Sequence, residues 1–186
     1  MESFKFLEDN QRLSNIKRFS MHRRNREQSV AEHSHTVAFL CCLTALIEKW
    51  DSDKAFDLLC RAIFHDFVEA RLGDIPSPSK RGMEEAVRQV EEKKIEEIVK
   101  GFPEEVREYL AECMKNAKNT TTEAGQVVTL ADTFDVLQYA KAEESCGNKS
   151  ILEDIEVTFD YIRSPEFRKM VDKHPFLRDV MERLLR

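Results

Sequence analysis

The chain contains 186 residues, which is the length of one domain with a sizeable hydrophobic core. With 34% charged residues and no run of about 20 apolar residues, the composition excludes an integral membrane protein. The formal net charge of −6 disfavours binding to nucleic-acid polymers, and the first five residues lack the features of a signal peptide.

Apolar residues recur at helical spacing along most of the chain. The pattern predicts helices over residues 4–16, 29–50, 52–72, 83–99, 103–117, 120–145, 150–162 and 165–185. The sequence therefore predicts an all-α protein, a bundle of about seven or eight helices in a single domain over residues 1–186. The motifs described below fall within residues 5–145, and residues 150–185 add C-terminal helices.

Three of these helices begin with capping signals. Residues 29–32 (S-x-x-E) and 120–123 (T-x-x-E) have the spacing of a capping box, in which a hydroxyl and a carboxylate each accept a backbone hydrogen bond. Ser52 or Asp53 is expected to cap the helix over residues 52–72.

Two connections differ in composition from the helices. Gly73 is a candidate for the positive-φ residue that follows a helix, and the two prolines of residues 74–78 predict a rigid, non-helical loop. Residues 22–26 (H-R-R-N-R) form a basic connection. This connection is either a solvated loop or a source of positive potential at the mouth of a phosphate site.

The cysteines indicate the redox environment. They show no CxxC pair and no regular spacing, which disfavours a disulfide framework or a zinc ribbon. Their positions are Cys41, Cys42, Cys60, Cys113 and Cys146. Free cysteines inside apolar helical patterns predict a protein of a reducing compartment, the cytoplasm.

Imidazole and carboxylate groups lie on the apolar faces of three predicted helices. His33 continues the stripe of the helix over 29–50, His65, Asp66 and Glu69 lie near the end of the next, and Asp132 lies on the helix over 120–145. A lone histidine on such a face is more often a hydrogen-bonded core residue than a ligand, and a lone aspartate is usually a cap or half of an ion pair. Buried carboxylates must nevertheless be paired, hydrogen-bonded or bound to a metal.

Taken together, two imidazoles and two carboxylates from three helices are a stronger signal than any one of them. This donor set suits one divalent transition metal ion, Mn²⁺, Co²⁺, Fe²⁺, Ni²⁺ or Zn²⁺. Four protein ligands on an octahedral ion leave positions for water and a phosphoryl oxygen, as metal-assisted hydrolysis requires.

The motifs resemble those of the HD-domain phosphohydrolases, and in particular the small bacterial 5'-deoxynucleotidases of that superfamily. The matching segments are Ala31-Glu32-His33-Ser34, His65-Asp66-Phe67-Val68-Glu69, Leu72-Gly73-Asp74-Ile75-Pro76-Ser77-Pro78, Leu130-Ala131-Asp132 and, upstream, Lys17-Arg18-Phe19. The order H…HD…D is specific for the superfamily, and the E-x-x-x-G-D-x-P continuation is typical of the nucleotidase-like branch. The C-terminal helices match only loosely.

The resemblance implies a mononuclear site with His33, His65, Asp66 and Asp132 as metal ligands. Dinuclear HD enzymes need extra histidines after the HD pair, and no histidine lies between His65 and residue 174. His35 lies two residues from His33 and is therefore expected to face elsewhere, and His174 and His22 are expected to be structural or solvated.

The resemblance also implies two carboxylates with catalytic roles. Glu69 is expected to orient or deprotonate the attacking water. The alternative role of Glu69 is a structural ion pair with Arg61 or Arg71. Asp74 is expected near the leaving oxygen, and its alternative is a residue that only stabilises a turn.

The remaining residues of the predicted site would bind the nucleotide. Arg18 is expected to hold the phosphate, because a guanidinium presents a planar fork of donors to phosphate oxygens. Phe19 is expected to lie against the sugar. The alternative is that Phe19 is only a residue of the hydrophobic core. Ile75, Pro76 and Ser77 would line the nucleoside side of the pocket, while His33, Asp66, Asp74 and Asp132 would face the phosphate.

The predicted function is hydrolysis of a 5'-deoxyribonucleoside monophosphate to deoxynucleoside and phosphate. The first alternative is a nucleoside triphosphate phosphohydrolase, which would need more cations, such as those of residues 23–26 and 80–81. The second is a non-catalytic binding protein on an HD scaffold. Family analogy predicts a homodimer, with the apolar faces of the C-terminal helices as a candidate interface.

Overall fold

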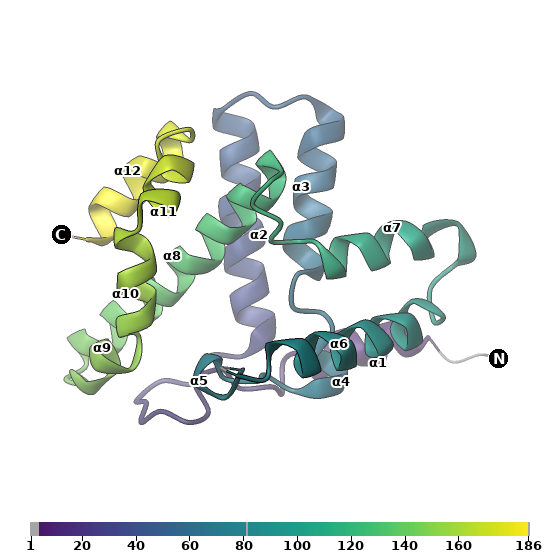
Figure 1. Ribbon diagram of the computed structural model, residues 1–186, viewed down its shortest axis with the longest axis horizontal. Helices are drawn as coiled ribbons and strands as arrows, with labels where there is room; N and C mark the ends of the chain where they lie inside the picture. The colour runs from purple at the N-terminus through teal and green to yellow at the C-terminus, as the bar shows by residue number, and fades with distance from the viewer. Residues whose placement is uncertain (1–3, 81, 186) are drawn as a thin grey trace.

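The computed structural model describes residues 4–80 and 82–185, and the regular structure of these residues is entirely helical (Figure 1). The helices are α1 (Lys5–Arg12), α2 (Val30–Ile47), α3 (Ser52–Phe64), α4 (Glu69–Leu72), α5 (Ser77–Lys80), α6 (Glu84–Val99), α7 (Glu104–Lys115), α8 (Glu123–Ser145), α9 (Ser150–Asp154), α10 (Glu156–Arg163), α11 (Pro165–Val171) and α12 (Pro175–Leu184). The predicted all-α fold is confirmed.

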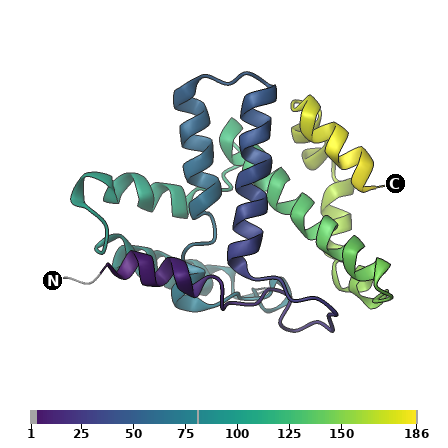
Figure 2. The same cartoon turned by 180° about the vertical axis from the view of Figure 1, so that it is seen from behind.

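The centre of the molecule consists of α2, α3 and α8. Helices α2 and α3 form an antiparallel hairpin, and α8 crosses them diagonally (Figures 1 and 2). Buried apolar side chains from all three helices, among them Val37, Leu58 and Phe134, form the main core cluster. The predicted metal ligands are carried by these three helices or by the residues directly after α3.

Two groups of helices flank this centre on opposite sides. Helices α1, α4, α6 and α7 lie on the side of the N-terminus around a second apolar cluster that includes Leu13, Phe67 and Ile98. Helices α9 to α12 lie on the side of the C-terminus and pack on α8 through residues such as Phe167 and Leu177. The C-terminal helices thus complete the main core.

One of the three predicted helix caps is present in the structure, and the other two differ from the prediction. Ser29 and Glu32 form the predicted capping box, with both reciprocal hydrogen bonds present. At α8 the capping residue is Thr122, whose hydroxyl accepts from the backbone N–H of Gly125, so the predicted box at residues 120–123 is wrong. At α3 the cap is Asp51, one residue before the predicted position.

More helices are present than predicted, because three predicted helices are interrupted. The helix over 52–72 breaks at residues 65–68, and the helix over 165–185 breaks before Pro175, whose ring disfavours a helical conformation at His174. A third break falls at Ile155, which separates α9 from α10. Residues 77–80 form one helical turn instead of a loop, since proline is tolerated in the first turn of a helix.

Helix α2 has the length and apolar composition of a membrane-spanning helix, with a mean hydropathy of 1.4 over its 18 residues. Only 39% of it is buried. Its buried side carries His33 and packs against α3 and α8, as expected of the central helix of a folded domain.

Candidate active site

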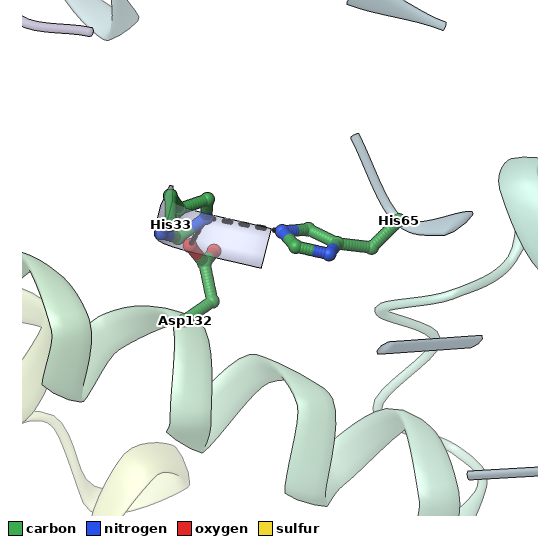
Figure 3. A group of neighbouring side chains, drawn as sticks. All are labelled: His33, His65 and Asp132. Atoms are coloured by element: carbon green, nitrogen blue, oxygen red, sulfur yellow. Dashed lines mark hydrogen bonds and ion pairs between the residues drawn. The ribbon is translucent and has the colours of Figure 1, made fainter. Parts of the chain in front are cut away.

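Three predicted metal ligands converge at the centre of the molecule (Figure 3). The Nε2 atoms of His33 and His65 lie 3.0 Å apart, and one Asp132 oxygen lies 3.1 Å from His33 Nε2. One ligand atom from each of the three residues fits within 4.8 Å of the others. Asp66 Oδ2 lies 3.4 Å from His33 Nε2 and 3.1 Å from His65 Nε2, so the fourth predicted ligand borders the same point.

Both imidazoles are fixed through their other nitrogen. His33 Nδ1 lies 2.6 Å from Asp135 Oδ2, and His65 Nδ1 lies 2.7 Å from the carbonyl oxygen of Ala62. An acceptor at Nδ1 keeps the proton there and leaves Nε2 as the ligand atom, as in histidines that bind metals. Both residues are buried. The donor set and its orientation therefore fit a single transition metal ion.

His65 and Asp66 lie in the tight turns that connect α3 to α4. Neighbouring residues of a regular helix point about 100° apart, because 3.6 residues make one turn. Here the chain leaves the helix after Phe64 and continues through tight turns, with Glu69 N donating to Asp66 O and Ala70 N to Phe67 O. In this segment the two side chains approach each other, with Asp66 Oδ2 3.1 Å from His65 Nε2.

Asp135 connects the predicted metal site to the predicted phosphate site. Besides His33, its carboxylate accepts hydrogen bonds from Arg18 Nη1 at 3.1 Å and from Gln28 Nε2 at 2.9 Å. Gln28 in turn accepts from Arg18 Nη1 at 3.1 Å. The Arg18 guanidinium is thereby held at the rim of the pocket, 4.0 Å from Asp132.

The ligand cluster has strongly perturbed protonation. Burial alone would lower the pKa of His33, but contacts with Asp132, Asp135 and Asp66 outweigh burial and raise the pKa to about 10. Burial also opposes ionisation of the aspartates, yet the neighbouring imidazoles and the Lys118 ammonium hold the pKa of Asp66 and of Asp132 well below the usual range. In the absence of a metal ion, positive side chains thus compensate these carboxylates.

Glu69 and Asp74 border the same pocket and show the opposite trend. Burial, together with the charges of Asp66 and Asp74, raises the pKa of Glu69 to about 9. Burial also raises the pKa of Asp74. Glu69 Oε2 is buried without a hydrogen-bond partner among the described residues.

The structure also tests the alternative roles of Glu69. Arg71 pairs with Asp9 at 2.7 Å and Arg61 with Asp57 at 2.7 Å. Neither predicted ion-pair partner therefore contacts Glu69. A buried carboxyl beside the predicted metal ligands fits a general base in position, and it acts as a base in its ionised form, which a nearby cation favours.

A pocket of about 390 Å³ opens directly beside these groups. Its polar side includes Arg18, Asp66, Glu69, Asp74 and Asp132, and its apolar side includes Phe19, Ile75, Pro76, Val136 and Ile155. Phe19 is also packed against the main core and stacks on Tyr139, with ring centroids 4.4 Å apart, so both predicted roles of this residue agree with its position. The side chain of Ser77 lies outside those that the structure describes.

Several residues at this site were not predicted from the sequence. Lys118 lines the pocket and contacts two of the predicted ligands. Thr158 and Tyr161 of α10 line its far wall, so the C-terminal helices contribute to the pocket. The basic residues 22–26 are mostly peripheral, since only His22 lines the pocket.

Glu143 holds the basic connection in place. Its carboxylate accepts hydrogen bonds from the backbone N–H groups of Asn25 and Arg26, both at 2.7 Å.

The chain is similar in sequence to known 5'-deoxynucleotidases. Residues 5–181 match the family described as 5'-deoxynucleotidase YfbR-like. A 5'-deoxynucleotidase of Photorhabdus laumondii is 31% identical over 145 residues, which cover 74% of this chain and 72% of that protein.

Solved structures show the same fold. An HD-domain phosphohydrolase from Listeria innocua has a TM-score of 0.66 at 21% identity, with 97% of each chain covered. A cyanophage S-2L HD phosphohydrolase, bound to dA and one catalytic Zn²⁺ ion, has a TM-score of 0.57 at 20% identity, with 94% of this chain and 96% of that chain covered. The predicted resemblance is confirmed: the chain has the fold of the HD-domain phosphohydrolases and belongs to the YfbR-like 5'-deoxynucleotidase family.

Proposed function

We propose that the protein hydrolyses 5'-deoxyribonucleoside monophosphates to deoxynucleoside and phosphate. One observation carries this proposal: both predicted carboxylate ligands, a guanidinium and a buried carboxyl with a raised pKa border one pocket. The two predicted imidazole ligands lie directly behind these carboxylates, at 3.1 Å from Asp132 and from Asp66. The pocket also has an apolar wall that suits a nucleoside. The family membership and the curated relatives named 5'-deoxynucleotidase support the same activity.

We propose that His33, His65, Asp66 and Asp132 hold one divalent transition metal ion. Mn²⁺, Co²⁺, Fe²⁺, Ni²⁺ and Zn²⁺ all suit two imidazoles and two carboxylates. Such an ion supplies Lewis-acid polarisation of a phosphoryl oxygen and lowers the pKa of water. The Zn²⁺ ion in the related cyanophage protein supports a mononuclear site.

Three side chains would carry out the chemistry around the phosphate. Arg18, held by Asp135 and Gln28, binds and orients the phosphate oxygens. Glu69 would be ionised once the positive charge of a bound metal ion lowers its raised pKa, and it would then take a proton from the attacking water as the water oxygen bonds to phosphorus. The bond from phosphorus to the 5' oxygen breaks, and Asp74, whose pKa is raised, delivers a proton to that oxygen.

The apolar wall would bind the nucleoside. Phe19 lies next to Arg18 in sequence, so its ring is placed near the sugar, and Ile75 and Pro76 extend the wall toward the base. Ser77 is proposed to lie on the same side.

Phosphate release from dAMP, AMP and dATP, each with Mn²⁺, Co²⁺, Zn²⁺ and Mg²⁺, tests the proposal. We expect dAMP to be the best of these substrates and a transition metal to be required. Faster release from dATP would favour the triphosphohydrolase instead. His33→Ala should abolish activity, and His35→Ala is the matched control, because His35 is exposed two residues away.

Failure of every metal to bind or to support hydrolysis would favour a non-catalytic binding protein. The protein would act in the cytoplasm, in agreement with its free cysteines.

We further propose that the protein is a homodimer that pairs through α2 and α3. These helices expose Phe39, Leu46, Phe56 and Ile63, each about half exposed or more. The exposed apolar residues of α10 include Tyr161, which lines the pocket, so this face is better suited to pairing than the predicted C-terminal one. Leu46→Glu should shift the sedimentation coefficient from that of a dimer to that of a monomer.

A further inference from the structure

Lys118 contacts one oxygen of each predicted carboxylate ligand, and an imidazole contacts the other oxygen. Its Nζ lies 2.8 Å from Asp132 Oδ2 and 3.4 Å from Asp66 Oδ1. The imidazole of His33 approaches the other oxygen of each, Asp132 Oδ1 at 3.1 Å and Asp66 Oδ2 at 3.4 Å. Each carboxylate therefore directs one oxygen toward the predicted metal position and the other toward the ammonium.

The Lys118 ammonium has a third N–H donor that can serve a ligand in the pocket. A lysine ammonium carries three N–H donors, and Asp66 and Asp132 are its ion-pair partners within the described part of the chain. The Lys118 side chain is 38% exposed and lines the pocket together with Arg18. A phosphate oxygen bound beside Arg18 would be a suitable acceptor for the third donor.

The position of Lys118 beside the pocket depends on close packing between the backbones of Asn119 and Gly125. Lys118 lies in the irregular segment between α7 and α8, and its neighbour Asn119 lies against the first turn of α8. A Cβ atom added to the buried Gly125 would lie only 2.1 Å from the carbonyl oxygen of Asn119, so glycine is required for this approach. The Asn119 carbonyl also accepts a hydrogen bond from Thr122 N at 3.0 Å.

We propose that Lys118 is a positioning residue with two roles. It orients the two carboxylates so that their other oxygens face the metal ion, and it donates its third hydrogen to the substrate phosphate. The second role rests on the proposed function, because it requires a phosphate in this pocket. The first role requires only the ligand cluster.

The test compares wild type with Lys118→Met, which keeps the length of the side chain and removes its charge. Lys115→Met is the matched control, since Lys115 is exposed at the end of α7. Lys118→Arg restores the positive charge, so it should restore part of the stability without metal and part of the affinity for phosphate. Circular dichroism of the metal-loaded proteins verifies that all variants are folded.

The first measurement is the melting temperature with and without a chelator. Without metal, Lys118→Met removes one of the cations that compensate Asp66 and Asp132. The melting temperature of this variant should therefore fall below that of wild type, and the difference should be larger without metal than in the Mn²⁺-loaded proteins. Equal losses in the two states, or no loss, would overturn the first role.

The second measurement is the inhibition constant of inorganic phosphate on the Mn²⁺-loaded enzyme, with kcat and KM for dAMP. Loss of a charge-assisted hydrogen bond should raise the inhibition constant and KM together, by roughly tenfold or more, with a smaller change in kcat. An unchanged inhibition constant would overturn the second role. Absence of any hydrolysis by wild type would overturn the proposed function instead, and the chelator experiment would still decide the first role.

Discussion

Asp135 Oδ2 lies 2.6 Å from Nδ1 of His33, although the two residues are 102 positions apart in the chain. The same carboxylate accepts a hydrogen bond from Arg18. One buried side chain therefore orients a predicted metal ligand and a predicted phosphate-binding residue. It lies on α8 one turn after Asp132, so both predicted functions of the site depend on a single helix face.

Asp135→Asn should weaken both functions while it preserves the shape of the side chain. We expect a loss of roughly 10–100-fold in metal affinity, as for other residues that hold a metal-binding histidine, and a rise in KM from the misplaced Arg18. Calorimetric titration with Mn²⁺ and steady-state kinetics measure the two effects. The control is Asp160→Asn, which changes an exposed ion pair. Wild-type metal affinity in Asp135→Asn would show that His33 needs no support from this carboxylate.

Asp66→Ala should remove the metal. Two imidazoles and one carboxylate would remain, and the site would lose one of its two negative charges. We expect loss of bound metal and of activity, while the helical content stays near that of wild type. Elemental analysis of the dialysed protein and circular dichroism measure these properties. Full activity with bound metal would exclude Asp66 as a ligand.

Glu69→Ala should lower kcat by roughly 10²–10⁴-fold, the usual contribution of general acid–base catalysis. The metal should remain bound, because the four predicted ligands are unchanged. Glu144→Ala, a change of an exposed glutamate on α8, is the control. If metal and activity disappear together in Glu69→Ala, then Glu69 is itself a ligand.

The raised pKa of Glu69 also predicts a pH-dependent stability of the metal-free protein. The folded protein keeps the Glu69 proton up to a pH of about 9, whereas the unfolded chain loses it near the ordinary pKa of 4.5. Between these values the folded state binds more protons, so this group makes the free energy of unfolding fall as the pH rises. Glu69→Gln cannot ionise and should not show this fall.

Thermal melts with a chelator at about pH 5 and about pH 8 measure the effect. The melting temperature of Glu69→Gln should exceed that of wild type by a wider margin at the higher pH. Each kcal/mol corresponds to roughly 2–4 °C in a domain of this size. A margin that does not change with pH would mean that Glu69 ionises at its ordinary pKa. Glu144→Gln is the matched control.

Local chemistry explains which features could be predicted from the sequence. The capping box at Ser29 and Glu32 needs only residues three positions apart, so its spacing identified it. The same spacing at residues 120–123 was misleading, because Thr122 caps α8 instead. The apolar face that carries Asp132 could also be predicted, because helical periodicity brings residues three and four positions apart to one side of the helix. The convergence of the three helices followed once the H…HD…D order was identified.

The features that could not be predicted depend on contacts between distant segments. Lys118 lies in an irregular segment without periodicity, and its position depends on the close packing of Asn119 against Gly125. The only sequence signal was a glycine in the first turn of a predicted helix. Likewise, no proline or glycine marks the end of α3 at His65 and Asp66, so the sequence predicted one continuous helix over residues 52–72.

Phe19 offers the last prediction, on the selectivity for the sugar. Its φ angle of 56° is unusual for a bulky residue. With this backbone, the Phe19 ring stacks on Tyr139 while the Arg18 guanidinium lies 5.2 Å from the same ring. The pocket thus places a flat apolar surface beside the predicted phosphate ligand. A 2'-hydroxyl pressed against that surface would lose its hydrogen bond to water, at a cost of about 1–3 kcal/mol.

That cost corresponds to a preference of roughly 5- to 150-fold for deoxyribonucleotides in kcat/KM. Phe19→Ala opens space for water beside the sugar, so hydrolysis of AMP should rise relative to that of dAMP. Phe6→Ala is the matched control, because Phe6 also stacks on an aromatic ring, that of Phe102, but lies away from the pocket. A constant ratio of AMP to dAMP hydrolysis, together with a lower melting temperature, would mean that Phe19 serves the core and that selectivity for the sugar arises from another wall of the pocket.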